Sequence, residues 1–252
     1  MPFTPAHPAI ILPLLKLGSR QLSATALILG AVAPDFEYFL KMDVNSVHSH
    51  TLTGLFYFDV PLTVVLAFVF HLVVKKNLIQ NLPVFFQMRF HPFISFDFKA
   101  YFRDRYGVFL VSALIGSASH LFWDGFTHLD GFFVQNMPYV YKDRVFPFQG
   151  ARYPLWYALQ HISTFAGLTI ILLAMIFMKP HPVHVVKPRW KYWIIIALLT
   201  MLIVLIRFNF NVQSIPIGRF VVSTITACCV AFIAAGCMRI RNTSIPLAKE
   251  NG

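Results

Sequence analysis

Long apolar stretches alternate with short polar connections along most of the chain. Five stretches come close to or exceed the roughly 20 mostly apolar residues that a helix needs to cross a bilayer. The fourth stretch is short, but Trp190 and Phe208 extend it at its two ends. The five expected transmembrane helices cover residues 52–74, 106–127, 155–178, 192–206 and 217–238.

The first 45 residues carry two further apolar runs, residues 8–17 and 22–40, joined by Gly18-Ser19-Arg20. The first run is too short to span, and the second ends in Pro34-Asp35-Phe36-Glu37. We expect these runs to form a helical hairpin that dips into the bilayer. The predicted fold is all-α: a polytopic integral membrane helical bundle with five full transmembrane helices plus an N-terminal helical hairpin.

Composition supports a membrane protein and removes one alternative. Charged residues make up 12% of the chain, against about 25% in soluble domains. The net charge of +11 would suggest a nucleic-acid partner in a soluble protein. Here the basic residues lie in short loops between apolar segments, where they set orientation and contact anionic headgroups. We therefore expect membrane lipid as the partner and no nucleic acid.

The distribution of Lys and Arg predicts the orientation. The 75–105 connection has six, the 179–191 connection four, the C-terminal tail three and the hairpin tip two, giving 15 of the 21 on one side. The richer side is expected to face the cytoplasm. The protein is thus a multi-pass protein of the cell membrane with a cytoplasmic C-terminus.

The chemistry-bearing pattern within the spans is Ser119-His120-Leu-Phe-Trp-Asp124-Gly-Phe-Thr-His128. Residues four apart lie on one helix face, so His120 and Asp124 can share a cation, with His128 one turn later. One imidazole nitrogen and one carboxylate oxygen suit zinc or another divalent transition metal. The alternative is a buried His–Asp pair that only stabilises the bundle.

The predicted topology gathers further His and Asp residues on the non-cytoplasmic side. No basic segment or cleavage site marks the N-terminus as a signal peptide, so we expect His7 to be retained. Ionisable groups within spans are rare and usually functional, which makes their clustering informative. The clustered residues are His7, Asp35, His48, His50, His120, Asp124, His128 and His161.

Other ionisable residues near the spans receive weaker assignments. Glu37 is two residues from Asp35, on a different helix face, and is the weaker ligand candidate. Asp59 could contact the ligands rather than the metal, and His71 is expected at the opposite interface. The expected organisation is a metal-site membrane domain over residues 1–178, comprising hairpin 1–45 and the first three spans. Residues 179–252 add two accessory C-terminal transmembrane helices and a tail.

Five sequence stretches together carry a family resemblance. The chain resembles the YdjM-like membrane-bound metal-dependent hydrolases, and more closely their relative, the domain-of-unknown-function family 4184. The resemblance runs from residue 1 to about residue 165. The matching stretches are Met-Pro-Phe-Thr-Pro-Ala-His7, Ala-Pro-Asp35-Phe-Glu, Ser49-His50-Thr51, Ser119-His120-Leu-Phe-Trp-Asp124-Gly-Phe-Thr-His128 and Leu-Gln-His161.

The YdjM-like group is in turn similar, in ligand order, to zinc-dependent phospholipase C and P1-type nucleases. This resemblance implies that Asp35, His50, His120 and Asp124 hold one metal, that Asp124 bridges to a second held with His7, and that His128 and His161 belong to a third. Phe165 stands where that pattern has Glu, and Met1 lies six residues from His7, so a free amine ligand has no counterpart. We expect one or two divalent ions, with zinc as the metal.

The resemblance implies a membrane-bound metal-dependent hydrolase that acts on a phosphoester or lipid-like substrate through a metal-activated water. Asp35 and Asp124 are the candidate catalytic residues, which would orient or deprotonate that water. One alternative is a metal-binding or structural membrane protein without catalysis. A second is cation transport, which predicts polar residues throughout the spans, whereas the last three spans are nearly devoid of them.

Overall fold

The computed structural model describes residues 3–18, 20–148, 150–181, 187–208 and 216–238. Helices dominate it, and five are long and apolar enough to cross a membrane, which confirms the predicted fold class. The C-terminal tail, with its expected cytoplasmic location, lies outside the described residues from position 239 onward.

The chain forms two compact units, each built from several segments. The expected boundary at residue 178 remains a prediction. Unit 1 comprises Met1–Glu37, Ser46–Val65 and Phe102–Ala174, and unit 2 comprises Tyr38–Asn45, Leu66–Tyr101 and Met175–Gly252.

The N-terminal hairpin begins unit 1. Its first arm is η1 (Thr4–Leu17), a 3₁₀ helix that contains Pro8 and Pro13. Proline lacks the N–H that an α-helical ladder needs, which favours the tighter winding here. The second arm was expected to be continuous, but it is divided into α1 (Ala24–Gly30), η2 (Ala33–Asp35) and α2 (Phe36–Lys41). Pro34 accounts for the break, because it has no N–H to donate to the carbonyl oxygen of Gly30, four residues earlier.

The two arms of the hairpin pack against each other. Ile11 of η1 is buried with Leu27 and Ala31 of the second arm. Each such side chain contributes on the order of 1.5–3 kcal/mol when removed from water. This apolar contact fixes the path of the chain from His7 to Asp35, the first two candidate ligands.

Helix α6 (Phe98–Thr127) provides the surface on which α1 rests. It is kinked at Arg105, whose φ is −135°, just before the expected start of the span at residue 106. A Cβ at Gly30 would lie 2.5 Å from the Ala113 carbonyl oxygen, and one at Gly116 would lie 2.5 Å from the Leu27 carbonyl oxygen. Glycine at both positions therefore permits a backbone approach that no other residue allows.

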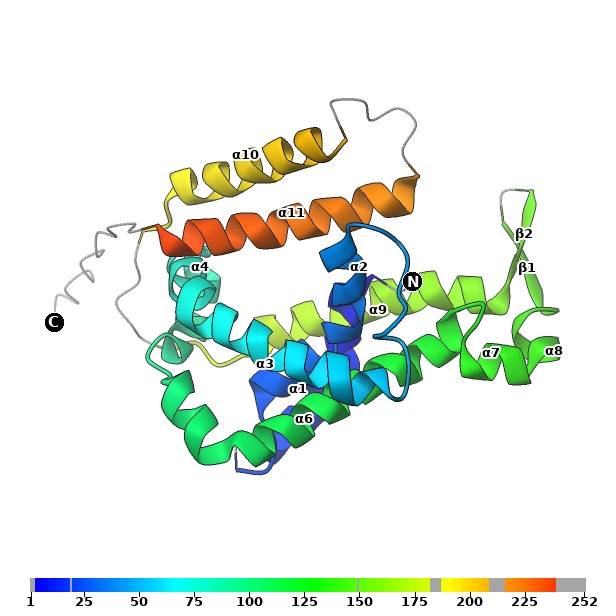
Figure 1. Cartoon of the computed structure of the whole chain (residues 1–252), viewed down its shortest axis with the longest axis horizontal. Helices are drawn as coiled ribbons and strands as arrows, with labels where there is room; N and C mark the ends of the chain where they lie inside the picture. Colours follow the sequence, from blue (N-terminus) through cyan, green and yellow to red (C-terminus); the bar gives the residue numbers. More distant parts are fainter. Residues whose placement is uncertain (1–2, 19, 149, 182–186, 209–215, 239–252) are drawn as a thin grey trace, which may run out of the picture. The chain divides into compact units, whose positions relative to one another are not determined.

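The rest of unit 1 comes from three segments. The first expected span begins with η3 (Leu55–Asp59), a single turn of π-helix, and continues as α3 (Val60–Val69). The connection from 128 to 154 holds two short helices and an antiparallel β-hairpin (Figure 1). These elements are α7 (Phe132–Asn136), α8 (Pro138–Tyr141), β1 (Val145–Phe148) and β2 (Ala151–Pro154), followed by α9 (Leu155–Phe177).

In unit 2, α10 (Trp190–Arg207) and α11 (Ile217–Cys237) lie side by side and antiparallel (Figure 1). Ala231 and Ala235 are buried against Tyr192, and such small side chains let membrane helices approach closely. The unit also contains η4 (Phe70–Val74), α4 (Lys75–Asn81), α5 (Val84–Phe90) and η5 (His91–Phe93).

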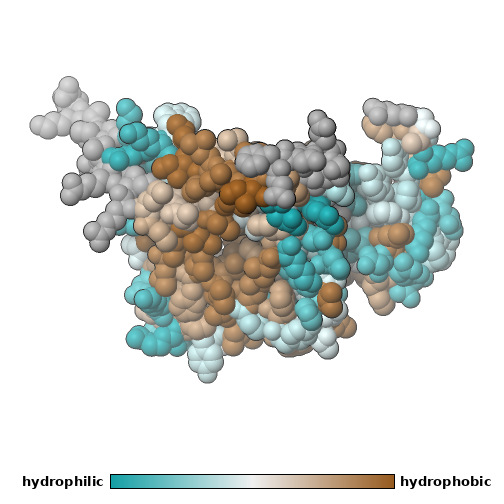
Figure 2. Space-filling view, turned by 45° about the horizontal axis from the view of Figure 1, so that its top comes forward, coloured by the Kyte–Doolittle hydropathy of each residue, from teal (hydrophilic) through white to brown (hydrophobic). Residues whose placement is uncertain are grey.

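Hydrophobic residues cover much of the face seen in Figure 2, with hydrophilic residues gathered beside them. The exposed apolar side chains of the molecule include Leu198, Leu202 and Ile206 of α10. A soluble protein rarely exposes apolar area on this scale. The exposed apolar side chains and the five long helices fit a membrane protein.

The close approach of α1 and α6 can be tested with two glycines of the same helix. Gly116→Ala should destabilise the protein by about 1–3 kcal/mol, because the new methyl group meets backbone. Gly107→Ala is the matched control, since a Cβ there meets nothing within 4 Å, and it should stabilise by roughly 0.5–1 kcal/mol. Thermal unfolding in detergent measures both. Equal effects of the two substitutions would contradict the tight helix contact.

Candidate metal centre

The C-terminal part of α6 carries three of the predicted ligands on one face. His120 and Asp124 are one turn apart, with His120 Nε2 3.2 Å from Asp124 Oδ2. The backbone N–H of His128 still donates to the Asp124 carbonyl oxygen at 3.0 Å, so the helical winding extends far enough to carry His128 with it. His128 Nδ1 lies 3.3 Å from Asp124 Oδ1. His120, Asp124 and His128 therefore lie along one helical face, as their spacing of four residues predicts.

Two other segments of unit 1 bring their ligands to the same place. Asp35 arrives from η2 and is fully buried, and His50 arrives from the segment before η3. His50 Nε2 lies 3.4 Å from Asp35 Oδ1 and 3.6 Å from Asp124 Oδ2. His120 Nε2 lies 3.6 Å from Asp35 Oδ1. Two nitrogens and two oxygens, from His50, His120, Asp35 and Asp124, thus converge on one point.

Four nitrogen–oxygen separations among these atoms match the edge length of a tetrahedral metal site. Zinc binds nitrogen and carboxylate oxygen at about 2.0–2.2 Å, so neighbouring ligand atoms in a tetrahedron lie roughly 3.3–3.6 Å apart. The four nitrogen–oxygen distances run from 3.2 to 3.6 Å. Asp35 Oδ1, Asp124 Oδ2 and His120 Nε2 are buried and have no hydrogen-bond partner among the described residues. A cation between them would satisfy all three.

The histidine tautomers agree with metal binding. His120 Nδ1 lies 2.8 Å from the Ala31 carbonyl oxygen, to which only an N–H can donate. A neutral imidazole has one proton, so the lone pair is left on Nε2, the atom that faces the carboxylates. In His50, Nδ1 lies 3.0 Å from Ser49 Oγ, which again leaves Nε2 toward the centre.

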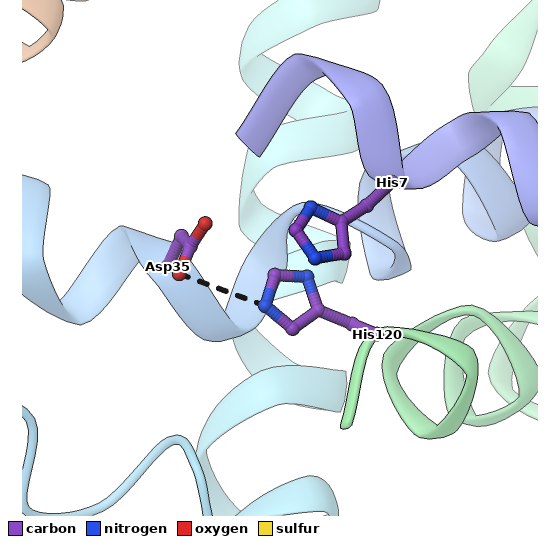
Figure 3. A group of neighbouring side chains, drawn as sticks. All are labelled: His7, Asp35 and His120. Carbon is purple, nitrogen blue, oxygen red and sulfur yellow. Dashed lines mark ion pairs between the residues drawn. The ribbon is translucent and has the colours of Figure 1, made fainter. Parts of the chain in front are cut away.

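A second ligand group forms around the other oxygen of Asp124. His7 Nε2 lies 3.1 Å from Asp124 Oδ1, the same atom that His128 Nδ1 approaches. The ring of His7 stacks on that of His120 with centroids 3.8 Å apart, and Figure 3 shows the two rings face to face with Asp35 beside them. Both oxygens of Asp124 therefore face histidine nitrogens, Oδ2 in the first group and Oδ1 in the second.

Glu37, the weaker ligand candidate, binds backbone N–H groups of a neighbouring segment. Its carboxylate is buried and accepts hydrogen bonds from the backbone N–H groups of Val47, His48 and Ser49 at 2.8–2.9 Å. These bonds hold the segment that presents His50. Thr4 also supports the centre, because its hydroxyl donates to Asp35 Oδ2. Neither contact carries a sequence signal, since each depends on the path of a distant loop.

The remaining candidates stand apart from these groups. His161 is exposed on α9, and its ring packs edge-on against Tyr157 with centroids 4.6 Å apart. Its assignment as a metal ligand stays a prediction. His48 is exposed and lies 2.9 Å from the Tyr57 hydroxyl. His71 belongs to unit 2, where its ring stacks on Phe98.

Proton affinities at the centre follow from burial and from the opposed charges. Burial by itself would lower the pKa of His50, but the carboxylates of Asp124 and Asp35 outweigh it and raise that pKa to about 9. Burial would raise the pKa of Asp35, yet His120, His50 and His7 hold it below its ordinary value. The Asp35 carboxylate is thus ionised at neutral pH and able to bind a cation.

The fold and the site define the class: a polytopic helical membrane protein with a buried His/Asp centre able to hold a metal ion. A family model described as "Domain of unknown function (DUF4184)" matches residues 1–237, so the chain belongs to that family. No curated protein and no solved structure matches it.

Removal of either central carboxylate should abolish tight metal binding. We expect at least one divalent ion per chain in detergent-purified protein and less than one in Asp35→Asn and Asp124→Asn. Loss of a residue that only supports a ligand lowers metal affinity by roughly 10- to 100-fold, and loss of a ligand itself should lower it further. Asp130→Asn, an exposed carboxylate near the end of α6, is the control. Elemental analysis measures the content. Equal metal in all four proteins would refute the assignment.

Metal affinity should rise with pH up to about pH 9. Below that value His50 carries a proton that must leave before Nε2 can bind a cation. One displaced proton gives about a tenfold gain in affinity per pH unit. Calorimetry in buffers of different ionisation enthalpy measures the proton released. A flat affinity between pH 6 and 9, without proton release, would contradict this protonation state.

Proposed function

We propose that the protein is a membrane-bound metal-dependent hydrolase that acts on a phosphoester, with a lipid-like molecule as the substrate. The observation that carries the proposal is the convergence of two imidazole nitrogens and two carboxylate oxygens, whose nitrogen–oxygen separations are 3.2–3.6 Å. Zinc is the metal that this ligand set suits. The kinship to YdjM-like hydrolases, and through them to zinc-dependent phospholipase C, remains part of the proposal.

When bound, a divalent metal would supply Lewis acidity, which lowers the pKa of a coordinated water to about 7 and polarises a phosphoryl oxygen. Asp35 and Asp124, the proposed catalytic residues, then act by holding and orienting. Both oxygens of each carboxylate face ligand atoms or the Thr4 hydroxyl, so neither has a free oxygen with which to take a proton.

Access to the centre supports a reaction with an external substrate. The side chains of His50 and His128 are 21% and 19% exposed, whereas those of His7 and His120 are at most 1% exposed. The His50 and His128 side of the centre therefore lies nearer the surface than the His7 and His120 side, although His50 Nε2 and both ring nitrogens of His128 are buried.

A neighbouring apolar groove supports a lipid-like substrate. It is lined by residues of η1, α6 and α9, among them Ile10, Phe126 and Leu159. Trp123 forms part of its wall, and the Trp123 ring lies 5.8 Å from that of His7. An alkyl chain in this groove would hold an ester headgroup beside the second ligand group. We place the centre on the non-cytoplasmic face of the cell membrane, in keeping with the distribution of Lys and Arg.

The proposal is tested with two nitrophenyl phosphodiesters that differ only in the second ester, one bearing a long alkyl chain and the other a methyl group. Zinc-loaded protein in detergent should hydrolyse the long-chain ester faster, and chelation or Asp124→Asn should remove the activity. Release of nitrophenol measures the rate. Metal-loaded protein that hydrolyses neither ester above the Asp124→Asn background would instead favour a metal-binding or structural protein without catalysis.

A further inference from the structure

Asp59 is a buried acid without a structural explanation. Its side chain is 0% exposed, and neither carboxylate oxygen has a hydrogen-bond partner among the described residues. Only its backbone carbonyl is engaged, by the Thr63 hydroxyl at 2.8 Å. An isolated buried carboxylate is so costly that proteins pair it, neutralise it or use it to face a cation.

The position of Asp59 indicates that its carboxylate faces a cation. It closes η3, a turn of π-helix at the start of a membrane span, and such turns frequently mark functional sites. η3 packs against η2, the turn that carries Asp35. The Asp59 carboxylate is within electrostatic range of His50 and His120. It is therefore close to the first ligand group, and no described distance makes it one of the converging ligands.

Charge balance indicates what the carboxylate is for. Asp35 and Asp124 carry −2 together, which neutralises one divalent cation when the histidines are neutral. A second cation on the other side of Asp124 adds +2 with no further carboxylate in its ligand group. Within the described part of the chain, no lysine or arginine pairs with Asp35, Asp59 or Asp124. Asp59 has no hydrogen-bond partner among the described residues, and its ionised carboxylate would offset this excess.

We propose that Asp59 is a counter-charge of the metal centre, which raises its affinity for divalent cations without being a ligand. The inference rests on the metal site of the proposed function, but not on hydrolysis. At the separations possible between neighbouring elements, one carboxylate acting on a divalent ion should change affinity by roughly 10- to 100-fold. No element of the fold depends on the charge itself.

The test is a zinc and cobalt titration of detergent-purified, metal-stripped protein. Asp59→Asn should bind both ions roughly 10- to 100-fold more weakly, while its cobalt absorption spectrum keeps the wild-type shape because the ligands are unchanged. Thr63→Val, which removes a buried hydroxyl on the same helix, is the matched control and should bind as the wild type does. Metal-free Asp59→Asn should unfold at the wild-type temperature or above, since an unpaired buried charge is removed.

Asp59→Leu guards against a loss of affinity caused by poor folding, because it removes the charge and suits the apolar surroundings. Wild-type affinity in both Asp59 variants would overturn the proposal, and so would an altered cobalt spectrum, which would make Asp59 a ligand. Weak binding together with a lowered unfolding temperature in both variants would make Asp59 structural and overturn it too. If the wild-type protein binds neither ion, the metal centre itself fails; if it binds them without hydrolysing esters, only the hydrolase proposal fails.

Discussion

The carboxylate of Asp124 is the contact on which unit 1 depends. Its two oxygens lie within 3.6 Å of nitrogen atoms from four histidines, which come from η1, the segment before η3, and α6. An ionised carboxylate in apolar surroundings must be compensated, by imidazolium or by metal, or the fold bears its full desolvation cost. The Asp124 carboxylate, which is costly to bury, therefore also holds the separate segments of unit 1 together through its contacts with the histidines.

This arrangement constrains the helices that surround it. His120 reaches Asp35 only because α1 ends against α6, where Gly30 and Gly116 let the two backbones touch. The same contact brings the Ala31 carbonyl oxygen to His120 Nδ1 and fixes the tautomer of the ligand. Helix packing and metal chemistry are thus coupled at the atomic level, because a shift that loosens α1 from α6 also frees the imidazole ring.

The sequence predicted those parts of the structure that local patterns encode. Span positions followed from apolar length, and the alignment of His120, Asp124 and His128 followed from helical periodicity. The gathering of His7, Asp35 and His50 near that helix was expected from topology, because Lys and Arg set which ends lie together. The structure brings six of these side chains close together, and their assignment as metal ligands stays a prediction.

Features set by the path of distant segments escaped prediction. Glu37 looked like a ligand from its neighbourhood, whereas its three backbone hydrogen bonds depend on a loop ten residues later. The break between α1 and η2 was concealed by a continuous apolar pattern, and only Pro34 hinted at it. Strands β1 and β2 are exposed along most of their length, so the sequence shows no alternation of apolar and polar residues that would predict them.

The described residues offer fewer metal ligands than the zinc-dependent phospholipase C pattern has. The resemblance to zinc-dependent phospholipase C assigns a third ion to His161 and to a glutamate four residues later. Phe165 occupies that second position and is 72% exposed, while His161 packs on Tyr157. Since α9 offers neither a carboxylate nor a converging imidazole, the described residues supply ligands for two ions at most.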